Sequence, residues 1–153
     1  MPELGLRSIV KGAANQIIDL AQRAVQAPSL SGQEEQVADL ILAEMQALGY
    51  DEVSRDAVGN VVGLMRGQGT HVTMLHSHMD IVDPGDPAAW SHPPFAGDIA
   101  DGYLWGRGAS DDKASLVAQV YAPALLRQAG YRPAGDVYVV AVVAEEMGGV
   151  GTR

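Results

Sequence analysis

Residues 137–144, VYVVAVVA, form an uninterrupted apolar run near the end of the chain. A strand with one face in water alternates apolar and polar side chains, whereas a continuous run is typical of a strand covered on both faces. Such a strand needs hydrogen-bonded neighbours along both of its edges. We therefore expect this run to be a central strand of a sheet. Because the sequence ends nine residues after it, we also expect the chain to be truncated, with part of the sheet missing.

Three stretches repeat their apolar residues at helical spacing, namely residues 8–26, 35–48 and 113–129. This period predicts helices that turn one apolar stripe toward a core. The expected stripes are Val10, Ala14, Ile17, Ala21 and Val25 in the first helix, and Val37, Ile41, Met45 and Leu48 in the second.

The ends of the second and third helices carry their own signals. Ser31 and Glu34 have the spacing of a capping box at the start of the second helix. Asp111 or Asp112 is suited to open the third helix as an N-cap. Pro123 inside that helix predicts a kink or a break, because proline lacks the backbone N–H that the helix requires.

Short β-type runs occupy residues 51–65 and 71–76, and residues 99–105 read as a hairpin around the turn pair Asp101-Gly102. The proline-rich residues 83–94 are expected to form an ordered loop. The order of helices, strands, helix and buried strand predicts an α/β fold in which helices sandwich the sheet. The sequence contains no internal repeat, and its 153 residues fit one domain.

Composition narrows the class of protein. The hydrophobic fraction of 47% and the charged fraction of 19% are those of a globular chain. The net charge of −9 argues against nucleic acid or an anionic membrane as a partner. The absence of cysteine, of a signal peptide and of a long apolar segment leads us to expect a cytoplasmic protein.

Histidine and acidic residues gather where a predicted strand ends, in the sequence H-S-H-M-D at residues 76–80. His76, His78 and Asp80 alternate along extended backbone and therefore share one side. A neutral imidazole is a good ligand for zinc-like ions, and a carboxylate such as Asp80 can orient it. The alternative is an ordinary polar strand end, which a motif this short does not exclude.

The segment G-R-G-A-S-D-D-K at residues 106–113 lies between the predicted hairpin and the third helix. Glycines permit a tight turn that can bring Asp111 close to a buried ion. Two alternatives are a simple N-cap role for Asp111 and a dinucleotide-binding turn. Asp111 stands where the third glycine of that nucleotide motif belongs, and its charge would repel a pyrophosphate.

Glu145 and Glu146 follow the apolar run directly. Open α/β sheets place their sites at the carboxyl ends of strands, and two adjacent carboxylates there are costly unless paired or bound to metal. One can ligate an ion while the other faces a bound water; the alternative is that both are solvated. His71 is expected on the surface, and we expect no substrate contact from His92. The three acidic or imidazole clusters together favour metal-assisted hydrolysis.

The motifs at residues 76–83, 90–113 and 142–152 resemble the co-catalytic zinc peptidases of the acetylornithine deacetylase, succinyl-diaminopimelate desuccinylase, aminoacylase and carboxypeptidase G family. This resemblance implies that His78 ligates one ion, that Asp111 bridges two ions and that Glu146 ligates the second. Asp80 would orient His78, and Glu145 would be the general base that takes a proton from a metal-bridging water. The family also implies a cis peptide bond between Asp111 and Asp112.

The same resemblance implies two divalent ions, zinc first with cobalt or manganese as alternatives, and a phosphorylase/hydrolase-like zinc-exopeptidase sandwich with a mixed sheet and helices on both faces. Residues 1–153 would be the N-terminal part of its catalytic domain. A lid or dimerisation domain, a further carboxylate and a last histidine would be missing, so this chain alone would be nearly inactive. The full protein would be a homodimer that acts on N-acyl amino acids or small peptides with a free carboxylate.

Two features depart from the family pattern, Asp112 in place of a frequent methionine and Ala114 in place of a frequent glycine. Neither position is a ligand. The competing hypotheses are a non-catalytic α/β fragment with structural carboxylates and, far behind, a dinucleotide-binding module.

Overall fold

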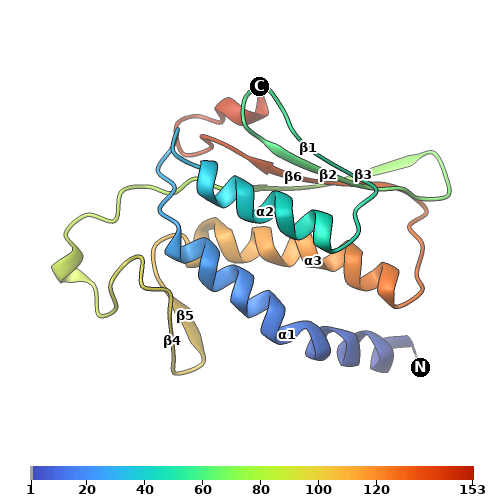
Figure 1. Cartoon of the computed structure of the whole chain (residues 1–153), viewed down its shortest axis with the longest axis horizontal. Coiled ribbons are helices and arrows are strands. Elements are labelled where there is room, and N and C mark those ends of the chain that lie inside the picture. Colours follow the sequence, from blue (N-terminus) through green and yellow to red (C-terminus); the bar gives the residue numbers. More distant parts are fainter. Residues whose placement is uncertain (1) are drawn as a thin grey trace.

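The computed structural model describes residues 2–153, with side chains from residue 5 onward. Figure 1 shows the helices packed beside a twisted sheet, with a small hairpin set apart from it. The helices are α1 (Pro2–Gln26), α2 (Glu35–Ala47) and α3 (Ala114–Gln128). Short helical turns lie at Pro87–Ala89, Ala109–Lys113 and Val150–Thr152.

The main sheet has four strands in the order β1 (Glu52–Arg55), β2 (Val61–Met65), β6 (Gly135–Val142) and β3 (His71–His78). β2 is antiparallel to both of its neighbours, β1 and β6, and β3 runs parallel to β6 with His78 opposite Val142. The apolar run thus forms an interior strand, as predicted, although the strand is shifted toward the N-terminus by two residues. The prediction of an α/β fold with a mixed sheet is confirmed.

The core lies between the sheet and the helices, which occupy one face of the sheet in Figure 1. Its fully buried members come from every layer: Leu20 from α1, Val37 and Ile41 from α2, Val120 from α3, and Val61 and Val139 from the sheet. On β3, Val72 and Met74 point away from these helices and are 67% and 61% exposed. Within the described residues, the helices cover one face of the sheet.

The first helix departs from its predicted stripe. Val10 is 49% exposed, whereas Leu20 and Ala24, outside the predicted set, are fully buried. The helix begins at Pro2, well before residue 8, and Ala13 is the first buried side chain among residues 5–26. The helical period was therefore read correctly, but the buried face belongs to the C-terminal half that packs on α3 and lies slightly rotated from the predicted stripe.

Pro123 does not interrupt the third helix. α3 runs continuously from Ala114 to Gln128, so the predicted break is wrong. Pro123 is buried with its neighbours Ala124 and Leu125, and their packing offsets the missing backbone hydrogen bond. Here tertiary packing outweighs local propensity.

The predicted hairpin is confirmed as β4 (Asp98–Ala100) paired with β5 (Tyr103–Trp105). Its turn residues Asp101 and Gly102 have φ values of 53° and 81°, the backbone that a two-residue hairpin turn with positive φ at both positions needs.

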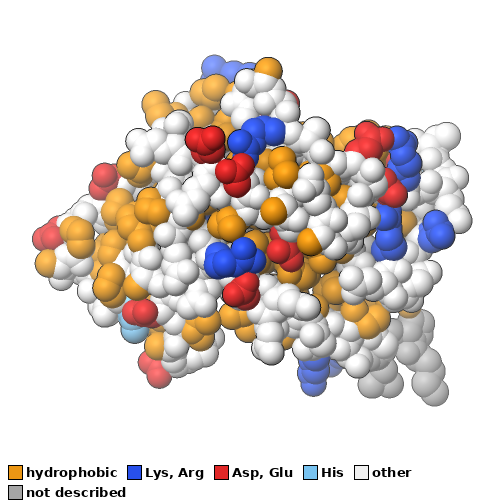
Figure 2. Space-filling model, in the orientation of Figure 1, with side chains coloured by type: hydrophobic (Ala, Val, Ile, Leu, Met, Phe, Trp, Pro, Cys, Tyr) orange, Lys and Arg blue, Asp and Glu red, His pale blue; other side chains and the backbone are white. Residues whose placement is uncertain are grey.

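Acidic and basic side chains are interspersed over the face drawn in Figure 2, with hydrophobic atoms between them. Among the described residues, no helix has the length and apolar character needed to cross a bilayer.

Candidate metal centre

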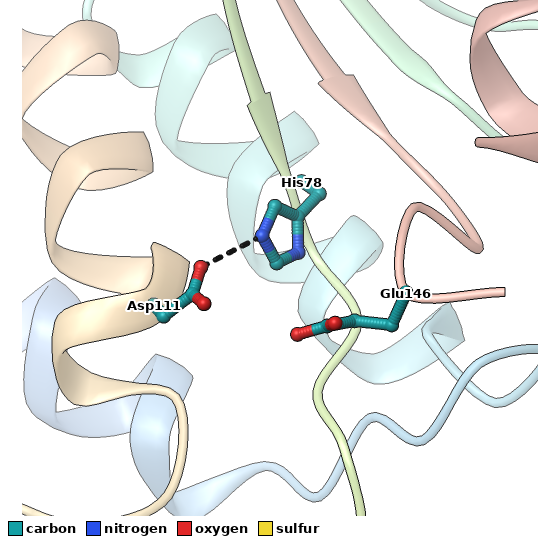
Figure 3. Close-up of side chains that lie close together, drawn as sticks. All are labelled: His78, Asp111 and Glu146. Carbon is teal, nitrogen blue, oxygen red and sulfur yellow. Dashed lines mark hydrogen bonds and ion pairs between the residues drawn. The ribbon is translucent and has the colours of Figure 1, made fainter. Parts of the chain in front are cut away.

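Three potential ligands meet at the carboxyl end of the two parallel strands (Figure 3). His78 is the last residue of β3, Glu146 follows β6, and Asp111 lies in the turn before α3. One ligand atom from each lies within 4.8 Å of the others. Parallel strands bring their carboxyl ends to one edge, which explains how residues so far apart in sequence converge.

The imidazole of His78 is held in one orientation. Its Nδ1 lies 3.0 Å from the main-chain oxygen of Asp80, which can only accept, so Nδ1 carries the proton. Its Nε2 lies 3.0 Å from Oδ1 of Asp111 and faces the other ligands. Nε2 is therefore the nitrogen available to an ion.

Burial lowers the pKa of His78, but the hydrogen bonds to Asp111 and to the Asp80 backbone, with the charges of Asp112 and Asp80, raise it above its ordinary value overall. The clustered carboxylates thus favour positive charge at this position, as expected of a cation site.

The carboxylate of Asp80 is fully buried and ties three segments together. Its Oδ1 accepts from the amide of Glu145 at 3.0 Å, and its Oδ2 accepts from the amide of Glu146 at 3.1 Å. The hydroxyl of Ser31 donates to Oδ2 at 2.6 Å. Oδ1 also lies 3.3 Å from Nδ1 of His78, so this carboxylate and the main-chain oxygen of Asp80 both face the imidazole.

The predicted capping box of Ser31 and Glu34 is wrong. α2 begins at Glu35, and the preceding Glu34 makes no side-chain cap. Ser31 is engaged with Asp80, while Oε1 of Glu34 accepts from the amides of Gly32 and Ala144 at 2.9 Å each. The two side chains have the spacing of a capping box, but they bond to Asp80 and to the amide of Ala144 instead of to the start of α2.

Ala144 has a φ of 50°, an uncommon left-handed conformation for a residue with a side chain. Its amide donates to Glu34, and the next two amides donate to Asp80. Carboxylates from two other segments thus hold the turn that presents Glu145 and Glu146, whose side chains are exposed.

The segment that carries Asp111 is positioned by its own contacts. The peptide bond between Asp111 and Asp112 is cis, which confirms the expectation from the resemblance. Gly108 has a φ of 81°, and a Cβ there would lie 2.6 Å from Cγ2 of Ile81, so glycine is needed for the close approach. Oδ2 of Asp112 accepts from the amide of His78 at 3.2 Å. Asp111 itself is 79% exposed and is not an N-cap, because the N-cap of α3 is Lys113.

Lys113 is a buried cation that the sequence analysis passed over. Its Nζ donates to the main-chain oxygens of Ala24 and Ala27 at 2.8 Å each, at the C-terminal end of α1. Burial lowers the pKa of Lys113 to about 8. These bonds connect the Asp111 segment to α1.

The remaining histidines lie outside the three-ligand group. His76 and His71 have exposed side chains, which confirms the expectation for His71. Nδ1 of His92 lies 2.9 Å from Oδ2 of Asp98, and its ring stacks on Trp105 with the ring centroids 4.8 Å apart. Strand alternation alone does not separate His76 from His78, and it was the family resemblance that selected His78.

Comparison with known proteins begins with a family model, described as peptidase family M20/M25/M40, which matches residues 74–153. Succinyl-diaminopimelate desuccinylase of Paracoccus denitrificans (strain Pd 1222) is 33% identical over 132 residues, which cover 84% of this chain and 34% of the desuccinylase. The chain therefore spans about a third of the length of that curated relative.

Solved structures share the fold. Human carnosine dipeptidase 1 superposes with a TM-score of 0.85 at 18% identity, covering 99% of this chain and 36% of the dipeptidase. The Bacillus subtilis YXEP protein, described as a dinuclear metal binding peptidase from the M20 family, has a TM-score of 0.66 at 20% identity over 89% of this chain and 36% of its own. The family model covers more than half of the residues, including all three candidate ligands, and the chain belongs to peptidase family M20/M25/M40.

Proposed function

We propose that this chain forms the N-terminal part, residues 1–153, of the catalytic domain of a metal-dependent hydrolase that cleaves an amide bond. The observation that carries the proposal is the convergence of His78, Asp111 and Glu146 at the carboxyl end of β3 and β6. Membership in a peptidase family gives the reaction class. The chain's share of its relatives' length means that other segments would complete the site.

The donor set fits a divalent ion. One imidazole nitrogen and two carboxylates within 4.8 Å are the ligand types that zinc takes, and cobalt or manganese accept similar sets. We propose that two ions would be held here, with His78 serving as ligand to one ion, Glu146 to the other and Asp111 to both. The M20 relative from Bacillus subtilis is described as dinuclear, which supports this number.

Each residue of this chain has a proposed task. Bound divalent ions would supply Lewis acidity toward the amide carbonyl and would lower the pKa of a water. Glu145 would accept the proton of the attacking water and return it to the leaving amine. Asp80 would hold the proton of His78 on Nδ1, which leaves Nε2 free to ligate, and would anchor the amides of Glu145 and Glu146.

The proposed substrates are N-acyl amino acids or small peptides with a free carboxylate. A desuccinylase and a dipeptidase are among the proteins that resemble this chain, and both names denote cleavage of an amide bond. The net charge of −9 is consistent with a small-molecule substrate rather than nucleic acid. We further propose that the full protein is a homodimer, as the family resemblance implies.

Zinc or cobalt titration with hydrolysis assays on the protein that carries this chain tests the proposal. Glu145→Gln keeps the shape of the side chain but cannot accept the proton, so we expect zinc binding to persist while hydrolysis falls by about 10² to 10⁴-fold. Met147→Ala, at an exposed neighbouring position, is the matched control and should keep both properties.

Two results would contradict the proposal. Hydrolysis that Glu145→Gln leaves intact would remove Glu145 from the mechanism. Hydrolysis that persists after complete metal removal would exclude a role for metal in the reaction. It would favour the alternative in which these carboxylates are structural. Specific NAD binding without metal would support the dinucleotide-binding hypothesis, against which the charged Asp111 on the third glycine position already weighs.

A further inference from the structure

Asp80 receives hydrogen bonds from parts of the chain that the proposed mechanism uses and from one part that it does not use. Its carboxylate faces four donors: the amides of Glu145 and Glu146, Nδ1 of His78, and the hydroxyl of Ser31. The first three belong to residues with a proposed ligand or base role. Ser31 belongs to the loop before α2.

We propose that Ser31 is a positioning residue of the metal centre, whose hydroxyl fixes the Asp80 carboxylate that aims His78 and anchors the Glu145–Glu146 turn. The inference rests on the proposed metal-dependent function and adds a residue to it. No motif that carried the resemblance includes Ser31, since those motifs begin at residue 76.

The geometry gives Ser31 a role that no other donor fills. An ionised carboxylate has about four acceptor positions on its two oxygens. Oδ1 takes the amide of Glu145 at 3.0 Å and faces His78 at 3.3 Å, while Oδ2 takes the amide of Glu146 at 3.1 Å and Ser31 at 2.6 Å. Without Ser31, every remaining donor would belong to a group that Asp80 is meant to hold in place.

Ser31 can act as a fixed reference because its own loop is held by the backbone. The amide of Ile81 donates to the carbonyl of Ser29 at 2.9 Å, and Leu30 forms a parallel bridge with Ile81. On the other side, Glu34 accepts from the amides of Gly32 and Ala144. The loop is thus bonded both to the segment after β3 and to the segment after β6, and its hydroxyl is preorganised.

Removing the hydroxyl leaves the Glu146 amide as the remaining donor to Oδ2, so the carboxylate is held less firmly. His78 and Glu146 would then be held less well in their ligating positions. Partners that orient metal ligands typically change metal affinity by about 10- to 100-fold when they are lost, and we expect the same range for Ser31→Ala.

The test compares Ser31→Ala, Ser31→Cys and Ser31→Thr in the protein that carries this chain. The zinc dissociation constant is measured by competition with a chromophoric chelator. Ser31→Ala should weaken zinc binding about 10- to 100-fold, Ser31→Cys should weaken it less because a thiol is a poor donor, and Ser31→Thr should restore it. If the alanine variant does not fold, the cysteine and threonine pair decides.

Ser29→Ala is the matched control. Its hydroxyl is fully buried in the same loop but donates to the main-chain oxygen of Met79 at 2.8 Å. We expect it to lower the melting temperature while zinc affinity stays close to the wild-type value. An equal loss of affinity in both alanine variants would show that Ser31 supports only the fold of the loop.

A second readout needs no metal. In the metal-free protein, the ¹⁵N shifts of the His78 ring and the amide exchange of Glu145 and Glu146 report on the Asp80 contacts directly. Ser31→Ala should disturb all of these, and Ser31→Thr should not. Unchanged signals in Ser31→Ala would overturn the positioning role. A wild-type protein that binds no zinc yet shows these changes would contradict the proposed function instead.

Discussion

The core beneath the helices and the carboxyl end of the sheet are built on opposite principles. The core joins apolar side chains from α1, α2, α3 and the sheet into one cluster, with Leu20, Ile41 and Val139 fully buried. At the carboxyl end, the carboxylate of Asp80 accepts hydrogen bonds from two backbone amides, and the carboxylates of Asp80 and Asp111 lie against the imidazole of His78.

This contrast shows where stability and function reside. Burial of apolar surface is non-directional, so the core tolerates shifts in any one contact but loses free energy with each lost methylene. The candidate metal centre depends on the orientation of its side chains, because a ligand that rotates away no longer binds. We expect core substitutions to lower the free energy of unfolding with little effect on the metal affinity of the folded protein. Substitutions at the candidate metal centre should lower metal affinity with little effect on the free energy of unfolding.

The largest expected effect comes from the core. Ile41→Ala removes a fully buried side chain of α2 and should lower the free energy of unfolding by about 2–5 kcal/mol, through lost burial and a residual cavity. Urea denaturation measures the loss, and zinc titration of the remaining folded protein should show wild-type affinity. Ile18→Ala, on the exposed side of α1, is the control with little expected change. Equal losses in both variants would argue against the core described above.

Lys113→Met tests the hydrogen bonds that join the Asp111 segment to the end of α1. The substitution fills the volume but leaves the carbonyls of Ala24 and Ala27 without their charged donor, at an expected cost of about 3 kcal/mol in unfolding free energy. Lys11→Met, at an exposed position of α1, should have almost no effect. A Lys113→Met variant as stable as the wild type would mean that the buried ammonium contributes nothing net to the fold.

His78→Ala tests the candidate metal centre. Loss of the Nε2 ligand should weaken zinc binding about 100-fold or more, which corresponds to about 2.7 kcal/mol of binding free energy. The melting temperature of the metal-free protein should change little in comparison with Ile41→Ala. His76→Ala on the same strand removes an exposed ring outside the ligand group and should leave the zinc affinity unchanged. Calorimetric titration measures the zinc affinity of both variants, and an equal loss of affinity in the two would contradict the ligand assignment.

The smallest effect is expected from a polar contact within the core. The hydroxyl of Tyr50 is buried and donates to the main-chain oxygen of Val120 at 2.7 Å. Tyr50→Phe should lower the free energy of unfolding by about 1 kcal/mol without changing zinc affinity. Tyr103→Phe on the exposed hairpin is the control. A change in zinc affinity with Tyr50→Phe would show that the two regions are coupled more strongly than their contacts imply.

Much of the fold was predictable because local patterns report which faces are buried. The continuous apolar run of β6, the β-type run predicted at residues 71–76 and the Asp101–Gly102 turn each correspond to one element of the structure, although β3 continues to His78. The errors arose where packing outweighs propensity. Pro123 lies within an unbroken α3, and Val10 is exposed although it continues the period of α1.

The candidate site was predictable in part for the same reason. His78, Asp111 and Glu146 were singled out as ligands by the family resemblance of their motifs, and the structure places one potential ligand atom of each within 4.8 Å of the others. Ser31 and Glu34 were misread as a capping box. Their spacing is identical in both roles, and only the position of Asp80 and Ala144 decides which groups their side chains meet.

The sequence alone therefore indicated which residues are candidates for chemistry and which stretches turn to a core, because residue type and period are local properties. Tertiary structure alone decided the network around Asp80, the burial of Lys113 and the exposure of His76. These depend on which segments lie side by side at the carboxyl ends of β3 and β6. A hydrogen bond between residues 49 positions apart, such as that of Ser31 to Asp80, has no local pattern that predicts it.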